Sequence, residues 1–237
     1  MPHSSIKLQD RLIVALDVPT VENAKALISA LGSSVSFYKI GMQLQFAGGI
    51  ELAKELAQRG KKVFLDAKLL DIDQAVANAA ENIAKLGVTF LTVHGNGPAV
   101  AAAVKGRGSS ALKVLAVTAL TSMDERDLAQ LGITMTVPQY VMHRVQTALD
   151  AGADGVIASG REAGAIRARG GSGFLIVTPG IRSEGTAHDD QKRVATPRQA
   201  IEAGADHIVM GREILRAPNP GAKVDAVLRE IEHALKS

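Results

Sequence analysis

Short apolar runs alternate with longer helical patterns eight times along this chain of 237 residues. The runs are rich in β-branched residues and almost continuously apolar, as is typical of parallel strands covered on both faces. They are Leu12–Leu16, Val35–Ile40, Lys62–Leu65, Thr89–Val93, Leu112–Val117, Gly155–Ala158, Phe174–Val177 and His207–Met210. Eight strand–helix units of about 30 residues each predict an α/β fold of the (β/α)8, or TIM-barrel, class.

The segments between the runs have the period of amphipathic helices, for example Val21–Leu31, Ile50–Gln58, Ala75–Lys85 and Tyr140–Ala151. Several end in Gly just before the next strand, and Ala-Gly-Ala-Asp occurs twice, at 151–154 and 203–206. We interpret these sites as αβ turns, because Gly readily adopts the left-handed conformation that ends a helix.

We expect a single domain over residues 1–237, since one barrel of this class has about this length. A doubly wound open sheet is the alternative. It usually has fewer strands, and Gly-x-Gly-x-x-Gly is absent after the first run. The one long polar stretch without helical period, 180–193, follows the seventh run and is typical of a functional lid or of local disorder.

Composition narrows the classes of function. The chain has no Cys, which excludes disulfides, thiolate zinc sites, iron–sulfur clusters and a Cys nucleophile. Aromatic residues make up 3% and the net charge is +3, which disfavours a nucleic-acid partner and suits a small anionic substrate. Neither a signal-peptide core nor an apolar run of about 18 residues occurs. We therefore expect a cytoplasmic protein without a membrane partner.

Charged residues gather where the predicted strands end, which is where barrels of this class place their active sites. Asp17 and Lys39 end the first two strands, and Asp66, Lys68 and Asp71 follow the third. Asp66 and Lys68 are two apart, so both side chains are expected on the inward face. Alternating signs would satisfy each charge and keep the lysines protonated, which suits proton donation better than Schiff-base chemistry. The alternative is a structural ion network at the barrel rim.

A second candidate subsite lies after the last two strands. Gly211 and Arg212 open a short helix directly after the eighth strand, a place where barrels often bind phosphate. Arg182 or Gln191 could close over the anion from the preceding loop. The alternative is that Gly211 only forms a turn and that Arg212 is solvated.

Other polar residues at strand ends give weaker signals. Ser122 and Glu125 fit a capping box of the next helix, so we expect Ser122 to be a cap and Thr121 to face the mouth. The six His residues lack metal-ligand spacing, and His94 is expected to pack at its strand end. Ser159 lacks a Gly-x-Ser-x-Gly elbow. Neither a metal site nor a serine hydrolase is predicted.

The motif Asp66-x-Lys68-x-x-Asp71-Ile72 resembles the signature of the orotidine 5′-phosphate decarboxylase family. The resemblance covers nearly the whole chain, through Leu16-Asp17, Tyr38-Lys39-Ile40-Gly41, Val93-His94-Gly95, Leu120-Thr121-Ser122, Ser159-Gly-Arg-Glu-Ala163, Thr178-Pro-Gly-Ile-Arg182 and Gly211-Arg212-Glu-Ile214. It implies a (β/α)8 homodimer with active sites at the interface. The implied activity is that of a carboxy-lyase that converts orotidine 5′-monophosphate (OMP) to uridine 5′-monophosphate (UMP) and CO2. This is the last step of de novo pyrimidine synthesis, and it uses no metal or organic cofactor.

The resemblance also implies roles for the matched residues. Lys68 protonates C6 as CO2 departs, Asp66 lies against the substrate carboxylate, and Lys39 completes the network and reaches the ribose. Asp71 enters from the partner subunit, and Asp17 binds ribose hydroxyls. The remaining substrate contacts that it implies are Thr121 at the pyrimidine, Gln191, Gly211 and Arg212 at the phosphate, and Arg182 beside the closing loop.

One segment departs from the family pattern. Many members continue the Asp-Ile of the motif with Pro-Asn-Thr, and this Thr contacts the ligand of the partner subunit. Here the segment is Asp73-Gln74-Ala75, and Ala75 has no hydroxyl to offer.

Two other functions stay open on the sequence alone. A Mg²⁺-dependent phosphosugar decarboxylase or aldolase of the same superfamily shares Asp-x-Lys-x-x-Asp, although the Leu-Thr-Ser and Pro-Gly-Ile-Arg segments favour the nucleotide enzyme. A non-catalytic barrel that binds phosphometabolites would keep the phosphate subsite but would gain nothing from the clustered charges.

Overall fold

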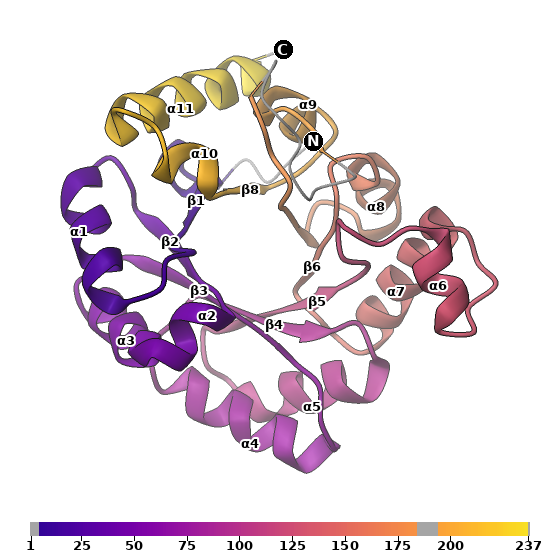
Figure 1. Ribbon diagram of the computed structural model, residues 1–237. Coiled ribbons are helices and arrows are strands. Elements are labelled where there is room, and N and C mark those ends of the chain that lie inside the picture. Colours follow the sequence, from indigo (N-terminus) through magenta and orange to yellow (C-terminus); the bar gives the residue numbers. More distant parts are fainter. Residues whose placement is uncertain (1–4, 184–193, 237) are drawn as a thin grey trace.

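A computed structural model describes residues 5–183 and 194–236, and the chain forms a closed barrel of eight parallel strands in sequence order (Figure 1). The barrel closes where β1 pairs with β8, with Ile13 opposite Val209. The strands are β1 (Leu12–Ala15), β2 (Phe37–Ile40), β3 (Lys62–Leu69), β4 (Phe90–His94), β5 (Lys113–Val117), β6 (Gly155–Ile157), β7 (Leu175–Thr178) and β8 (His207–Met210). The predicted fold class is confirmed.

Helices surround the barrel on its outside (Figure 1). They are α1 (Val21–Leu31), α2 (Met42–Leu44), α3 (Ile50–Gln58), α4 (Asp73–Ala84), α5 (Gly97–Arg107), α6 (Glu125–Gln130), α7 (Val137–Asp150), α8 (Ala163–Gly170), α9 (Pro197–Glu202), α10 (Arg212–Leu215) and α11 (Pro220–Lys236). A 3-10 turn, Leu8–Arg11, precedes β1, and a π-helical turn, Gln45–Gly49, joins α2 to α3. Within the described residues, no helix is long and apolar enough to cross a membrane. The cytoplasmic location stays a prediction.

The strands are apolar on both faces because the barrel has two cores. Inward side chains fill the barrel: Ile13, Ala15, Phe37, Phe64, Phe90, Leu115, Val177 and Val209. Outward side chains pack against the helices in a larger second core. Strand residues therefore alternate between two apolar layers, which explains the continuous hydrophobicity of each run.

Local sequence sets several helix ends. Thr136 and Gln139 form a capping box at the start of α7, and Thr196 and Gln199 form one at α9. Gly152 and Gly204 have φ angles of 75° and 106°, so both Ala-Gly-Ala-Asp copies are αβ turns, as predicted. Some helix and strand limits differ from the prediction. For example, α4 begins at Asp73 rather than Ala75, and β3 runs four residues past the predicted end at Leu65.

Candidate active site

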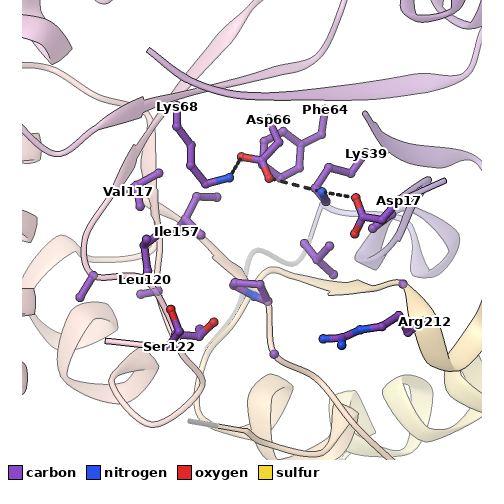
Figure 2. A pocket seen from close by; sticks show the side chains of 18 of the residues that line it. Asp17, Lys39, Phe64, Asp66, Lys68, Val117, Leu120, Ser122, Ile157 and Arg212 are labelled. Atoms are coloured by element: carbon purple, nitrogen blue, oxygen red, sulfur yellow. Dashed lines mark hydrogen bonds and ion pairs between the residues drawn. The ribbon is translucent and has the colours of Figure 1, made fainter. Parts of the chain in front are cut away.

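A cavity of about 290 Å³ opens at the carboxyl ends of the strands. Its lining brings together eight residues selected from the sequence: Asp17, Lys39, Asp66, Lys68, Thr121, Arg182, Gly211 and Arg212. Figure 2 shows the charged residues of β2 and β3 along one wall, with Ser122 and Arg212 on the other side of the space. Apolar side chains, including Phe64 and Ile157, also line the cavity.

Four charged groups of alternating sign form a continuous chain along this wall (Figure 2). The Lys39 Nζ lies 3.0 Å from Asp17 Oδ1 and 3.4 Å from Asp66 Oδ2. The Lys68 Nζ lies 2.7 Å from Asp66 Oδ1. Asp66 thus holds one lysine on each carboxylate oxygen, and each ammonium has an acidic neighbour.

The surroundings of Asp66 and Lys39 favour the charged forms of both side chains. Burial raises the pKa of the Asp66 carboxyl, but Lys39 and Lys68 outweigh it, so the pKa lies below its ordinary value. Burial lowers the pKa of the Lys39 ammonium, but Asp66 and Asp17 move it above its ordinary value. The expected protonation of Lys39 is therefore supported by its surroundings.

The backbone of β3 departs from a regular strand inside the motif. Leu65 pairs with Leu91 and Leu69 with Val93, so three residues of β3 face the single residue Thr92 of β4. Lys68, within this bulge, has a φ of 48°, a left-handed conformation that is unusual for a residue other than Gly. The predicted convergence of Asp66 and Lys68 is confirmed, but it arises in a bulged strand rather than from regular alternation.

Two contributors to this wall were missed by the sequence analysis. The Thr92 hydroxyl donates to Asp66 Oδ1 at 2.9 Å, and the Gln45 side chain donates to the carbonyl oxygens of Ile40 (2.9 Å) and Asp66 (3.1 Å). A lone hydroxyl within the apolar run of β4, beside the charged strand, is the signal that could have revealed Thr92.

The phosphate subsite predicted after β8 faces the charged wall. Gly211 precedes α10, and a Cβ there would approach Ala15 Cβ to 3.3 Å and Asp17 Oδ2 to 3.4 Å. The absence of a side chain thus leaves room between β1 and β8. Arg212 and Arg182 both line the cavity, and Arg182 is largely buried. Two guanidinium groups can therefore meet one anion at this side.

The capping role expected of Ser122 is wrong. The N-cap of α6 is Asp124, which accepts from the backbone N–H groups of Arg126 and Asp127 and forms the capping box with Asp127. Asp124, two residues closer to the helix, is its cap, and a carboxylate is among the preferred N-cap groups. Ser122 instead lines the cavity beside Thr121, so two hydroxyl-bearing residues lie there.

The remaining predicted residues lie elsewhere. Asp71 is exposed, accepts from the Ile72 N–H at 2.7 Å, and is absent from the described cavity lining. Gln191 lies outside the described residues, as does most of the 180–193 loop. His94 is half-buried at the end of β4, and burial together with Arg144 and Lys68 lowers its pKa. Ser159 is buried and accepts from the Arg161 N–H at 3.2 Å, as a turn residue does.

A closed (β/α)8 barrel with alternating lysines and carboxylates at its mouth, facing an arginine-lined subsite, defines a barrel enzyme for a small phosphorylated substrate. Residues 10–227 match the model of the orotidine 5′-phosphate decarboxylase/HUMPS family. The chain belongs to this family.

Relatives and solved structures agree with this assignment. The chain is 51% identical over 226 residues to an orotidine 5′-phosphate decarboxylase of Rhodopseudomonas palustris (strain BisA53), covering 95% of this chain and 96% of that one. It is 51% identical over 235 residues to the protein of that name from Bradyrhizobium diazoefficiens, covering 99% of both. The crystal structure of orotidine 5′-phosphate decarboxylase from Lactobacillus acidophilus matches with a TM-score of 0.82 and 38% identity, covering 93% of this chain and 98% of that one.

Proposed function

We propose that this protein is a carboxy-lyase that decarboxylates OMP to UMP and CO2 in pyrimidine biosynthesis. The observation that carries the proposal is the alternating chain from Asp17 through Lys39 and Asp66 to Lys68 in the cavity. The names of the relatives at about half identity favour this reaction over the magnesium-dependent and the non-catalytic alternatives.

The chemistry demands a fixed cation beside C6. When the C6–carboxylate bond breaks, its electron pair stays on a ring carbon that lacks a good electron sink, so the site must stabilise this charge. The Lys68 ammonium supplies positive charge and then gives its proton to C6. Asp66 lies against the departing carboxylate and holds Lys68 in place. Lys39 and Asp17 orient the ribose.

Residues on the other side of the cavity contact the phosphate and the pyrimidine of the nucleotide. Arg212, Arg182 and the backbone at Gly211 bind the phosphate, with Gln191 from the loop. Thr121 contacts the pyrimidine. Binding the remote phosphate contributes energy that closes the site and raises the rate, not only the affinity. We treat residues 1–237 as one catalytic domain, since all eight strands build one mouth.

We also propose that the enzyme is a homodimer and that Asp71 acts in the partner's site. Met42 and Phe46 follow β2, and Leu70 and Ile72 follow the neighbouring strand β3. All four are exposed, Phe46 by 88% and Ile72 by 74%. An apolar surface at this edge suits a second copy of the chain. Asp71 lies within this segment, which supports its action across an interface.

The proposal is tested by the absorbance loss of OMP with a chelator present. We expect turnover with formation of equal amounts of UMP and CO2, and no increase when Mg²⁺ is restored. No turnover of OMP, or turnover only with Mg²⁺, would contradict the assignment. Among the described residues, no group of three or more His, Asp or Glu side chains is placed to hold a metal. The absence of a cofactor stays a prediction.

A further inference from the structure

We infer that Thr92 is a positioning residue: its hydroxyl fixes the bulge of β3 and thereby sets where the Lys68 ammonium lies. The inference rests on the proposed function for its kinetic readout. Thr92 follows Phe90 on the inward face of β4 and is fully buried. It is the one residue of β4 that lies between the two points where the β3–β4 register resumes.

The Thr92 hydroxyl replaces a backbone hydrogen bond that the bulge removes. Three residues of β3 oppose one residue of β4, so regular ladder bonds cannot form across this gap. The Lys68 N–H donates instead to Thr92 Oγ1, at 3.0 Å. Without this acceptor, a backbone donor within the barrel wall would lose its partner, which is unfavourable.

The direction of the two bonds is fixed by the chemistry of a hydroxyl. A hydroxyl has one proton to donate and lone pairs to accept with. Because Thr92 accepts from the Lys68 N–H, its own proton goes to Asp66 Oδ1, at 2.9 Å. The same carboxylate oxygen accepts from the Lys68 Nζ at 2.7 Å. One hydroxyl thus fixes both the backbone of the proton donor and the carboxylate that orients its ammonium.

This arrangement also explains how Lys68 keeps its unusual backbone. A left-handed φ of 48° is unfavourable for a residue with a side chain and persists only where surrounding contacts hold it. The bond to Thr92 is such a contact. Relaxation of Lys68 toward an ordinary strand conformation would change the direction of its Cα–Cβ bond and displace its ammonium from Asp66.

The test replaces the hydroxyl with a methyl group of similar size. For Thr92→Val we expect kcat on OMP to fall roughly 100-fold, because displacement of a catalytic group by about 1 Å has this effect. The affinity for UMP should change less than about threefold, since the ribose and phosphate contacts remain. Thr92→Ser keeps the hydroxyl and should restore kcat to within about threefold of the parent. Thr92→Ala takes the place of Thr92→Val if the latter does not fold.

Thr89→Val is the matched control. Thr89 also accepts a β3 backbone N–H, from Val63 at 3.3 Å, but at the other end of the same strand pair. The Thr89→Val variant should retain the parental kcat. A readout independent of turnover is hydrogen exchange of the Lys68 amide, which should be protected in the parent and in Thr92→Ser and should exchange faster in Thr92→Val.

The outcomes separate the two proposals. If the parent does not decarboxylate OMP, the proposed function fails, while amide exchange at Lys68 still decides the role of Thr92. If the parent is active and Thr92→Val matches Thr89→Val in kcat, the inference is wrong. Thr92→Ser as slow as Thr92→Val would also overturn it, since packing rather than the hydroxyl would then be responsible.

Discussion

A lysine ammonium on a flexible stem becomes a defined proton donor only when its neighbours restrict it. Lys68 is restricted at both ends: its Nζ by Asp66, and its backbone by Thr92. On the opposite side of the cavity, Arg212 is placed by the start of α10 directly after β8. At the scale of single residues, the site therefore separates into a reacting side and an anion-binding side.

The first prediction concerns Lys68. Lys68→Ala removes the proton donor and should lower kcat at least about 10³-fold, near the upper range for a general acid. UMP should still bind. Lys62→Ala is the control, because Lys62 begins the same strand and pairs with Asp10 away from the cavity. Initial rates on OMP measure both. A Lys68→Ala rate within about tenfold of the parent, only ~1.4 kcal/mol in barrier, would remove Lys68 from this role.

The second prediction concerns Arg212. Arg212→Ala should lower kcat/KM for OMP by a factor that corresponds to about 2–4 kcal/mol of transition-state stabilisation, because a charged contact to the phosphate is lost. Decarboxylation of the unphosphorylated nucleoside should barely change. Arg216, exposed at the end of α10, provides the control variant Arg216→Ala, which should behave as the parent on both substrates. An equal loss for both substrates with Arg212→Ala would mean that the residue supports structure instead.

At the scale of elements, the close approach of α4 and α5 stands out, and the two helices lie side by side (Figure 1). A Cβ at Gly106 of α5 would overlap the backbone of Ala77 in α4. Because α4 follows the segment that carries Asp71, this contact also sets the position of the helix next to the site. The small residue at 106 is therefore required by packing rather than by backbone conformation.

The third prediction tests this contact. Gly106→Ala should lower the free energy of unfolding by about 1–3 kcal/mol, since forced separation of the helices outweighs the helix propensity gained. Gly164→Ala in α8 is the matched control. A Cβ there meets nothing closer than the Ala203 carbonyl oxygen at 3.7 Å, so stability should stay the same or rise slightly. Urea denaturation measures both. Equal stability of the two variants would show that α4 and α5 can move apart without cost.

At the scale of the whole molecule, the stability of the fold depends on packing at the end of the barrel away from the cavity. His207, the first residue of β8, is buried there, with ring centroids 5.7 Å from Phe37 and 5.2 Å from Phe90. Its Nδ1 lies 2.7 Å from the carbonyl oxygen of Asp10, a hydrogen bond that the neutral ring can make. Burial lowers the pKa of His207 to about 4.

The fourth prediction concerns the stability of the fold against pH. At a pH between the ordinary His pKa of 6.5 and the folded value of about 4, His207 is protonated in the unfolded chain but neutral in the folded chain. Stability should therefore be independent of this group above pH 6.5 and fall by up to roughly 3 kcal/mol as the pH drops to 4. His207→Gln should flatten this decline, whereas His143→Gln, at an exposed position on α7, should not. Thermal unfolding from pH 8 to 5 measures it. An unchanged slope in His207→Gln would contradict the prediction.

The fifth prediction concerns assembly. If Asp71 acts in the partner's site, Lys68→Ala and Asp71→Ala are each inactive, but a mixed dimer has one site with both residues intact. Refolding equal amounts together gives about half mixed dimers, so roughly 25% of the parental activity should return. Each variant refolded alone is the control. A mixture that stays inactive although mixed dimers form would place Asp71 outside the partner's site.

The amino-acid sequence alone predicts the eight strands, the αβ turns and the charged residues at the strand ends. These features follow from local periodicity, from the conformational freedom of Gly and from the rule that parallel strands end at one mouth. Leu12, Lys39 and His207 lie in the strands where they were expected. The sequence therefore predicts that Lys39 and Asp17 lie at the same mouth of the barrel.

Packing in the folded chain sets four other features: the bulge of β3, the bond from Lys68 to Thr92, the position of Ser122 at the cavity and the burial of His207. Each depends on residues far apart in the chain: Lys68 and Thr92 meet because β4 lies beside β3, and His207 meets Phe37 and Phe90 because the barrel closes. Ser122 lost its expected role to Asp124, a competing cap two residues on. Propensity and spacing describe a segment alone, whereas register, burial and hydrogen-bond partners are set by the segments packed against it.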